Sequence, residues 1–390
     1  MADLLVGTLL FLAIVIGWFL GKLESKRQPP AGSAALPRDY FRGVNLLLNE
    51  KQDEAMEVFL KTLQVSPDTV DTYLVMGSLF RRRGEVDRAI RIHQDLLARP
   101  SLSKEQQATV RLELSKDYLK AGLFDRSERL LKELVDEGGQ QVEECLEKLL
   151  SIYEQEKEWQ DAVNVAQQLL GKGKSGYSKR LSHYYCELAQ GALELNDRVE
   201  CRRQLKKALQ ADKSCVRASL IQAKLELSQK NYKEAVKVLR RVRHQDPDFI
   251  PEVLDLLEQS YDGIEQPREF TKYLFEVLEE HPAISIVIKL AEKVSAIEDD
   301  TAGAFVLSEY LKKRPSVKGL NRLIEYHIPH TEGAARDNLS ILQAFTHQLI
   351  QNKPRYRCVQ CGFDGKRLHW HCPSCKEWGT VKPIHGLEGE

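Results

Sequence analysis

Residues 231–247 read NYKEAVKVLRRVRHQDP, and this stretch shows the repeating unit of the chain most clearly. Ala235 lies near the start of an expected helix, and Pro247 follows it by twelve residues. A small side chain lets a second helix cross closely, whereas proline ends a helix because it lacks a backbone N–H. The stretch therefore predicts the second helix of a helix–turn–helix unit that ends at Pro247.

The small residue recurs along most of the chain at a spacing close to 34 residues. The aligned positions are Ala55, Ala89, Ser127, Ala162, Cys201, Ala235, Phe270 and Gly303. The steps between them are 34, 38, 35, 39, 34, 35 and 33 residues. A period of this length indicates helix pairs that each expose an apolar face for the next pair to cover, and so an elongated stack.

This pattern resembles the tetratricopeptide repeat. The resemblance implies an all-α fold in which about eight or nine helix pairs stack into a superhelical solenoid over residues 37–350. Residues 316–352 are expected to close the array. Phe270 departs from the pattern because it replaces the small residue. An irregular seventh pair is therefore expected.

The N-terminus carries a segment expected to cross a membrane, residues 1–21. Its core, LLVGTLLFLAIVIGWFLG, holds 18 uncharged residues, which suffice for a bilayer at about 1.5 Å per residue. Asp3 precedes the run, whereas the positive charges follow it at Lys22, Lys26 and Arg27. The positive-inside rule then predicts a single-pass protein with its N-terminus outside the cytoplasm and the bulk of the chain inside. Residues 22–36 are expected to form a linker.

The charge balance argues against one class of function. The chain holds 57 Lys and Arg against 57 Asp and Glu. A protein that coats nucleic acid would be basic overall, so no nucleic-acid partner is expected. Residues 351–383 hold seven basic against two acidic residues. This positive charge would suit RNA, but an anionic bilayer is a simpler negatively charged partner.

Residues 351–390 are expected to form a metal-binding domain. Cys358 and Cys361 make one C-x-x-C turn, and Cys372 and Cys375 make a second one. Two such turns can bring four thiolates to one metal ion in a tetrahedron. So short a segment cannot build much of a core, so the metal is expected to supply most of its folding energy.

The turns C-x-x-C-G and C-P-x-C resemble rubredoxin and zinc-ribbon knuckles. Thiolate ligands suit iron or zinc, and the spacing does not separate the two. His369 and His371 could replace a cysteine, although four cysteines already suffice. Phe363, Trp370 and Trp378 are expected to pack around the site. They exceed what so small a domain can bury alone, so it is expected to dock against the array.

The other four cysteines, at positions 145, 186, 201 and 215, are expected to fill the core. Gly171, Gly173 and Gly176 match G-x-G-x-x-G, but the preceding segment is helical where a dinucleotide site needs a strand, so a loop is expected.

The inner face of the array is expected to carry charged side chains, either as a partner-binding surface or as solvated faces. They are Arg81, Arg82, Lys116 and Lys120, then Glu144, Glu147 and Glu154.

The sequence carries no H-E-x-x-H, G-x-S-x-G or phosphate-loop motif, so an adaptor is expected and not an enzyme. An electron-transfer protein with a rubredoxin-type iron centre is the alternative. A possible homo-oligomer stays open.

Anchor, repeat array and rubredoxin-like tail in this order resemble the lipopolysaccharide assembly protein B family of Gram-negative bacteria. The resemblance covers the whole chain and implies residence in the bacterial inner membrane, with the N-terminus in the periplasm. It also implies control of lipopolysaccharide synthesis, together with the membrane protease FtsH, the deacetylase LpxC and proteins of lipopolysaccharide synthesis and transport.

Overall fold

The computed structural model describes residues 41–43, 45, 46, 54, 55, 58, 70–100, 102–387, 389 and 390. The predicted anchor and linker, residues 1–36, lie outside the described residues. Within the described part, no helix combines the length and the apolar character that crossing a membrane requires.

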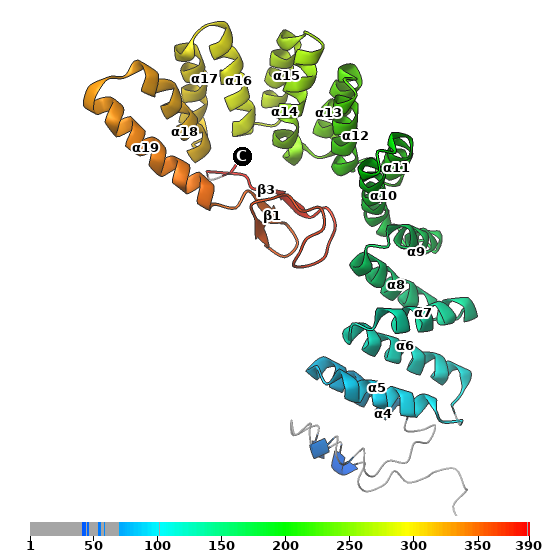
Figure 1. The fold of residues 1–390 in the computed structure, drawn as a ribbon. Helices are drawn as coiled ribbons and strands as arrows, with labels where there is room; N and C mark the ends of the chain where they lie inside the picture. The colour runs from blue at the N-terminus through cyan, green and yellow to red at the C-terminus, as the bar shows by residue number, and fades with distance from the viewer. Residues whose placement is uncertain are drawn as a thin grey trace, which may run out of the picture. The chain divides into compact units, whose positions relative to one another are not determined.

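Helices make up nearly all of the described chain (Figure 1). The helices are α4 (Val70–Arg83), α5 (Val86–Leu97), α6 (Lys104–Lys120), α7 (Phe124–Glu137), α8 (Val142–Glu156), α9 (Trp159–Gly171), α10 (Tyr177–Glu194), α11 (Arg198–Ala211), α12 (Val216–Ser228), α13 (Tyr232–Gln245), α14 (Ile250–Gly263), α15 (Pro267–Glu280), α16 (Ile284–Ile297), α17 (Asp300–Lys313), α18 (Val317–His327) and α19 (Gly333–Asn352). Two short 3₁₀ turns, η2 (Pro247–Phe249) and η3 (Ile328–His330), interrupt them.

The C-terminal segment forms a small sheet, with strands β1 (Tyr356–Cys358), β2 (Asp364–Gly365) and β3 (Val381–Pro383). The strand order is β2-β1-β3, and both neighbouring pairs are antiparallel. We call residues 356–383 the knuckle. The chain divides into two compact parts, residues 1–130 and 131–390, and the knuckle belongs to the second.

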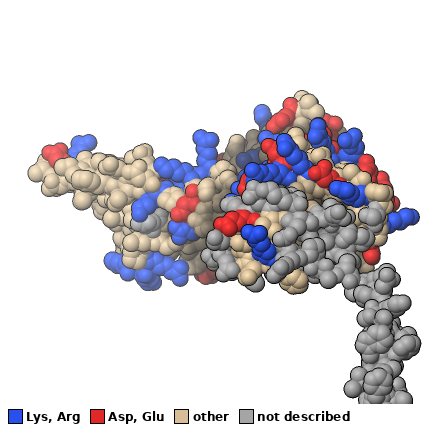
Figure 2. Space-filling model, turned by 90° about the horizontal axis from the view of Figure 1, so that it is seen from below, with Lys and Arg blue, Asp and Glu red and all other residues tan. Residues whose placement is uncertain are grey.

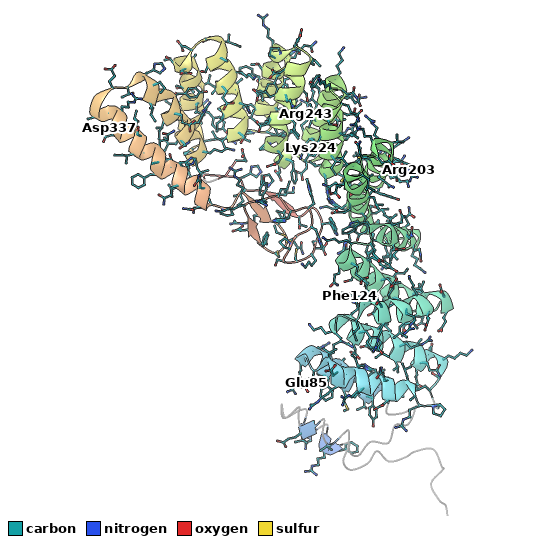
Figure 3. All side chains as sticks on the ribbon, in the orientation of Figure 1. Glu85, Phe124, Arg203, Lys224, Arg243 and Asp337 are labelled. Atoms are coloured by element: carbon teal, nitrogen blue, oxygen red, sulfur yellow. The ribbon has the colours of Figure 1, made fainter. Side chains whose placement is uncertain are left out.

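The helices come in pairs, which confirms the tetratricopeptide pattern. From Ala89 to Gly303, each residue of the predicted small-residue series is the fourth residue of a second helix, α5 to α17. Every one of these residues is buried. Figure 3 shows the side chains that fill the space between neighbouring helices. The spacing of the series therefore gave the position of each helix crossing.

Most pairs share one turn. The residue two positions before the second helix has a positive φ in six of the described pairs. The six residues are Gly84, Gly122, Lys157, Asn196, Lys230 and Glu265, with φ between 57° and 84°. Glycine adopts this left-handed conformation freely, whereas lysine and glutamate adopt it against their steric preference. The stacking of the pairs therefore imposes the turn even where the residue does not favour it.

The seventh pair, α14 and α15, is regular in its helices but wider at its crossing. Phe270 is fully buried at the position that a small residue occupies elsewhere. Its ring lies against Tyr261 of α14, with ring centroids 5.6 Å apart. The two backbones approach each other less closely than those of α16 and α17, where Gly303 stands at the crossing. The expected irregularity is therefore a local widening.

The interior contains the remaining cysteines, as predicted. Cys145, Cys186, Cys201 and Cys215 are all buried in the array. A separate core cluster runs from α12 to α16 and contains Val238, Leu257 and Leu274 among its fully buried members. The apolar faces that the repeat pattern predicted are therefore covered by neighbouring helices.

Candidate metal centre and its docking surface

The structure brings the four predicted cysteines together in the knuckle. The Sγ atoms of Cys358 and Cys375 are 3.7 Å apart, and those of Cys361 and Cys372 are also 3.7 Å apart. All four sulfur atoms lie within 4.8 Å of one another. A tetrahedral ion at about 2.3 Å from each thiolate would place two sulfurs about 3.8 Å apart. The cluster therefore has the size that one four-coordinate ion requires.

The two C-x-x-C turns have the same backbone geometry. The N–H of Gly362 donates to the carbonyl of Cys358 over 2.9 Å, and the N–H of Lys376 donates to that of Cys372 over 3.0 Å. Both residues have a positive φ, 77° for Gly362 and 61° for Lys376. This reversal just after the second cysteine turns backbone N–H groups toward the sulfur atoms, where they stabilise negative charge.

The pKa values of the thiols follow from these contacts. Burial raises the pKa of Cys358, but hydrogen bonds from the Thr380 hydroxyl and from the amides of Cys361 and Gln360 outweigh it and lower the pKa to about 6. The amide of Glu377 lowers the pKa of Cys375, yet burial and the neighbouring thiols raise it to about 12. Four thiols this close cannot all ionise unless a cation offsets their charge. The donor set therefore fits a metal cation.

Neither histidine takes part in the cluster. The Nε2 atom of His371 lies 2.8 Å from the carbonyl of Lys376, and its ring stacks on Trp378 with centroids 4.4 Å apart. His369 contacts the edge of the Phe363 ring instead. The group of side chains that could hold an ion consists of the four cysteines alone among the described residues. His371 therefore has a packing role.

The knuckle has a very small core of its own. It consists of Tyr356, Cys358, Cys372 and Val381, with Phe363 and Leu368 packed beside them. Phe363 thus packs near the site as predicted. Trp378 also packs inside the knuckle, on His371, and the rings of both tryptophans contact the array. The expected docking against the array is therefore confirmed.

Trp378 makes the main contact with the array. Its side chain is 3% exposed. The ring stacks on His183 of α10 at 5.2 Å and meets the edges of Tyr184 and Trp159 at 5.8 and 6.0 Å. Its Nε1–H donates to Glu154 Oε1 over 2.8 Å, and Tyr184 donates to the same oxygen over 2.5 Å. One carboxylate thus anchors both an array residue and a knuckle residue.

A second group of contacts holds the other side of the knuckle. Trp370 stacks on Phe249 of η2 with centroids 5.3 Å apart. Tyr356 donates to Glu252 over 2.6 Å, and the Lys382 ammonium lies 2.9 Å from Asp248. Both pairs are partly buried, so their charges are less screened than on an open surface.

The C-terminal residues return to the array. The Glu390 carboxylate accepts from the Ser285 hydroxyl and from Lys318, each over 2.8 Å. The N–H of Val317 donates to the carbonyl of Leu387 over 2.9 Å. Leu387 and Glu390 therefore link the C-terminal end of the chain to α16 and α18.

The array surface beneath the knuckle comes mainly from the first helix of each pair. Contacts come from α8, α10, α14, α16 and α18, and Arg217 of α12 lies over the Trp378 ring at 5.9 Å. Figure 1 shows the knuckle on the inner side of the curve that these pairs follow. We call this the inner surface of residues 131–352.

The electrostatics of this contact depend on a neutral histidine. Burial, together with the positive charges of Arg217 and Lys179, lowers the pKa of His183 to about 3. Arg217 is itself held by Glu187 over 2.9 Å. The ring that stacks on Trp378 is therefore uncharged at neutral pH.

Comparison with known proteins places these features in one family. The rubredoxin metal binding domain family matches residues 356–383, and tetratricopeptide repeat families match residues 72–107 and 192–259. Lipopolysaccharide assembly protein B of Escherichia coli strain K12 is 37% identical over 382 residues, which cover 98% of each chain. The chain belongs to the lipopolysaccharide assembly protein B family.

A second member of the lipopolysaccharide assembly protein B family, from Haemophilus influenzae, is 36% identical over 97% of this chain and 98% of its own. Among solved structures, a tetratricopeptide repeat protein from Parabacteroides merdae matches 72% of this chain and 99% of its own, with 14% identity and a TM-score of 0.33. The predicted family is therefore confirmed by relatives that span both the array and the knuckle.

The predicted inner charges in this family member are largely paired within the chain. Arg81 lies 2.6 Å from Glu113 and 2.7 Å from Asp117, and Lys116 lies 2.7 Å from Glu113. Glu147 accepts a hydrogen bond from Tyr177, and Glu154 accepts one from Trp378 of the knuckle. The sequence thus placed Glu154 on the inner face but gave no sign that the knuckle would bind it.

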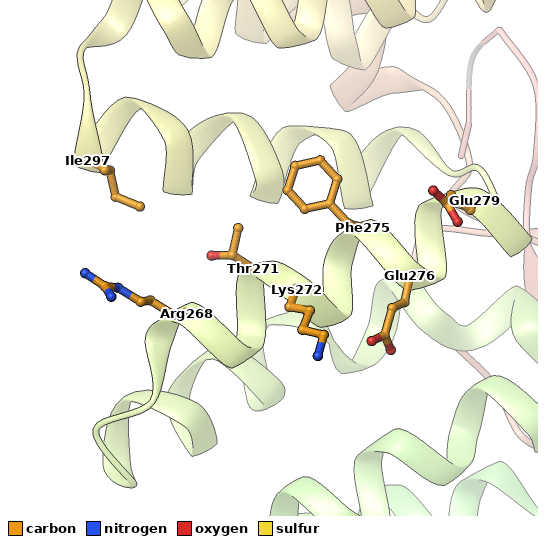
Figure 4. Close-up of a pocket in the computed structure, with 7 residues that line it drawn as sticks. All are labelled: Arg268, Thr271, Lys272, Phe275, Glu276, Glu279 and Ile297. Carbon is orange, nitrogen blue, oxygen red and sulfur yellow. The ribbon is translucent and has the colours of Figure 1, made fainter.

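Two other features of this lipopolysaccharide assembly protein B relative do not form sites. Gly171 is the last residue of α9, and Gly173 and Gly176 lie in the loop between α9 and α10, as predicted. A groove of about 520 Å³ runs along α15 to the end of α16 (Figure 4). Its lining residues are Arg268, Thr271, Lys272, Phe275, Glu276, Glu279 and Ile297. The groove has an apolar floor and charges of both signs at its rim, without polar groups that converge on one point.

Proposed function

We propose that this chain is a membrane-anchored adaptor in lipopolysaccharide assembly, without catalysis of its own. The single observation that carries the proposal is family membership along 98% of the chain. The repeat array supports it physically, because stacked helix pairs offer long surfaces for protein partners. Following the family resemblance, we infer that the chain acts in the bacterial inner membrane with FtsH and LpxC, and so regulates lipopolysaccharide synthesis.

We propose further that Cys358, Cys361, Cys372 and Cys375 bind one iron or zinc ion, and that the ion is structural. Four thiolates fill a tetrahedral site and leave no position for a substrate. The ion would offset the charge of the sulfurs and hold the two turns together. Metal analysis of the purified chain, combined with a midpoint potential, would distinguish this role from electron transfer. A reversible potential that matched a cellular electron carrier would favour the redox alternative.

The adaptor proposal is tested by removing the predicted anchor, residues 1–21. An anchor confines the array near the bilayer and raises its effective concentration toward membrane partners. A chain without these residues should fold and bind partners but regulate poorly, so the LpxC level in cells should rise. Replacement by an unrelated transmembrane helix should restore the level if tethering alone is required.

Two results would contradict the adaptor proposal. One is normal regulation by the untethered chain at its native abundance. The other is turnover of a substrate by the purified chain alone. A foreign helix that fails to restore regulation would instead indicate that the anchor contacts a partner helix directly.

A further inference from the structure

The last helix of the array exposes an apolar stripe. Ile341, Leu342, Phe345 and Leu349 of α19 are 53%, 51%, 61% and 53% exposed. They recur at intervals of one, three and four residues, which places them along one side of a helix. The terminal helix of a solenoid normally turns a polar face to water, because no further repeat covers it. The stripe therefore requires an explanation.

The stripe is also free of charge. Arg336 and Asp337 are the only Lys, Arg, Asp or Glu residues of α19, and both lie in its N-terminal part, where Figure 3 labels Asp337. From residue 338 to residue 352 the helix has no such side chain. Figure 2 shows this as a tan surface at the left of the view. Four large side chains about half exposed form a patch of several hundred Å², a size that marks interaction sites.

Basic side chains follow the stripe directly. Arg355 comes three residues after α19, just before β1, and Lys366 and Arg367 come just after β2. All three are exposed. No carboxylate of the described residues lies within salt-bridge distance of them. We call these three residues the basic corner.

The sheet register explains where the basic corner points. Tyr356 pairs with Gly365 across β1 and β2, so Arg355 and Lys366 lie opposite each other at the next position. Side chains alternate along a strand, so Arg355 points away from the side on which Tyr356 contacts Glu252 of the array. The β2 edge is also opposite the β3 edge, where Lys382 contacts η2.

The cross-strand arrangement is unfavourable in isolation. Two like charges opposite each other in a sheet repel, so Arg355 and Lys366 destabilise the knuckle slightly unless an anion lies near them. Arg355 follows Leu349, the last residue of the stripe, by only six residues. An apolar stripe and a cationic patch are thus adjacent on the second part of the chain.

We propose that the stripe of α19 and the basic corner together bind an anionic lipid surface. Interfacial helices insert an apolar face among acyl chains while nearby Lys and Arg side chains attract anionic headgroups. The inference rests on the membrane residence in the proposed function, which keeps a bilayer within reach, and it assigns a second membrane contact at the far end of the chain.

The experiment uses the full chain with p-benzoylphenylalanine in place of Phe345. The matched control carries the same residue in place of Val199 of α11, which is 79% exposed. Each protein is mixed with an excess of nanodiscs, made either of phosphatidylcholine or of phosphatidylcholine with phosphatidylglycerol, and illuminated. We expect several-fold more phospholipid adducts at position 345 than at position 199, with the larger yield in the anionic discs.

A charge-reversed variant, Lys366→Glu with Arg367→Glu, tests the basic corner. Its adduct yield at position 345 should lose the preference for anionic discs while its metal content stays unchanged. Equal yields at positions 345 and 199 would overturn the proposal, and so would adducts at position 345 to a second copy or to another protein in place of lipid. Co-elution of the chain with the discs tests the predicted anchor separately. Because the discs are in excess, lipid adducts at position 345 can form with or without the anchor, so the two proposals can fail independently.

Discussion

The docking of the knuckle gives the sharpest prediction, through Trp378→Ala. The side chain is 3% exposed and touches three aromatic rings of the array. Truncating a buried tryptophan to alanine costs about 3–5 kcal/mol. Part of this loss is the hydrogen bond to Glu154, because a bond to a charged acceptor contributes about 1.5–3 kcal/mol. Trp378→Phe keeps most of the ring and loses the bond, so it should cost about 1.5–3 kcal/mol.

The rate of limited trypsin digestion measures these losses of docking free energy. Cleavage after Arg357 requires β1 to leave the sheet, and in the equilibrium regime its rate follows the population of the open form. Each 1.4 kcal/mol then raises the rate about tenfold. We expect at least a 100-fold increase for Trp378→Ala and roughly tenfold or more for Trp378→Phe. Val359→Ala, at a position 69% exposed on the same knuckle, should stay within about twofold.

The reasoning would be refuted if Trp378→Ala were cleaved no faster than Val359→Ala while keeping its metal. That result would mean that the aromatic contacts with α9 and α10 do not hold the knuckle in place. Metal content must be measured in each variant, since loss of the ion alone would also expose β1.

Three further predictions concern the metal, the turns and pH. Cys358→Ser or Cys375→Ser should lose the bound ion by elemental analysis and lower the melting temperature of the chain; full metal content and stability would contradict the proposed ligand set. Glu265→Gly should raise the free energy of unfolding by up to about 1 kcal/mol, because Glu265 has φ +57°, whereas Glu269→Gly inside α15 should lower it by a similar amount. His183 is neutral in the folded chain down to about pH 3, whereas the unfolded chain protonates it near pH 6.5. Stability should therefore fall as pH drops from about 6.5 toward 3, by up to about 1.4 kcal/mol per unit, and denaturant midpoints should show a flatter slope for His183→Leu.

The array could be predicted because its signal is local. A helix crossing needs a small side chain at one position, so the spacing from Ala89 to Gly303 located every second helix. Phe270 shows the limit of this reasoning, because the pattern did not reveal that Tyr261 would pack against its ring. The shared left-handed turn has a sequence signal at Gly84, Gly122 and Asn196, whereas lysine and glutamate at the same position carry none.

The cysteine cluster was predictable for the same reason, whereas its docking partners were not. A C-x-x-C turn is fixed by four neighbouring residues, but Trp378 and Glu154 are 224 residues apart in the chain. The excess of tryptophan in the tail signalled that some surface must cover it. Nothing in the sequence identified His183 or Phe249 as that surface, because such contacts depend on how the whole stack curves.

The knuckle acts as an intramolecular ligand of the inner surface of residues 131–352. An attached segment competes for its surface at an effective concentration in the millimolar range, without regard to how much free peptide is present. If the attached form is favoured by a few kcal/mol, as the burial of Trp378 indicates, the surface is free in less than about one molecule in a hundred. A peptide with an intrinsic Kd near 1 µM for that surface would then show an apparent Kd near 0.1 mM or weaker. Partners of residues 131–352 must therefore either outcompete the knuckle or use helix faces that it leaves uncovered.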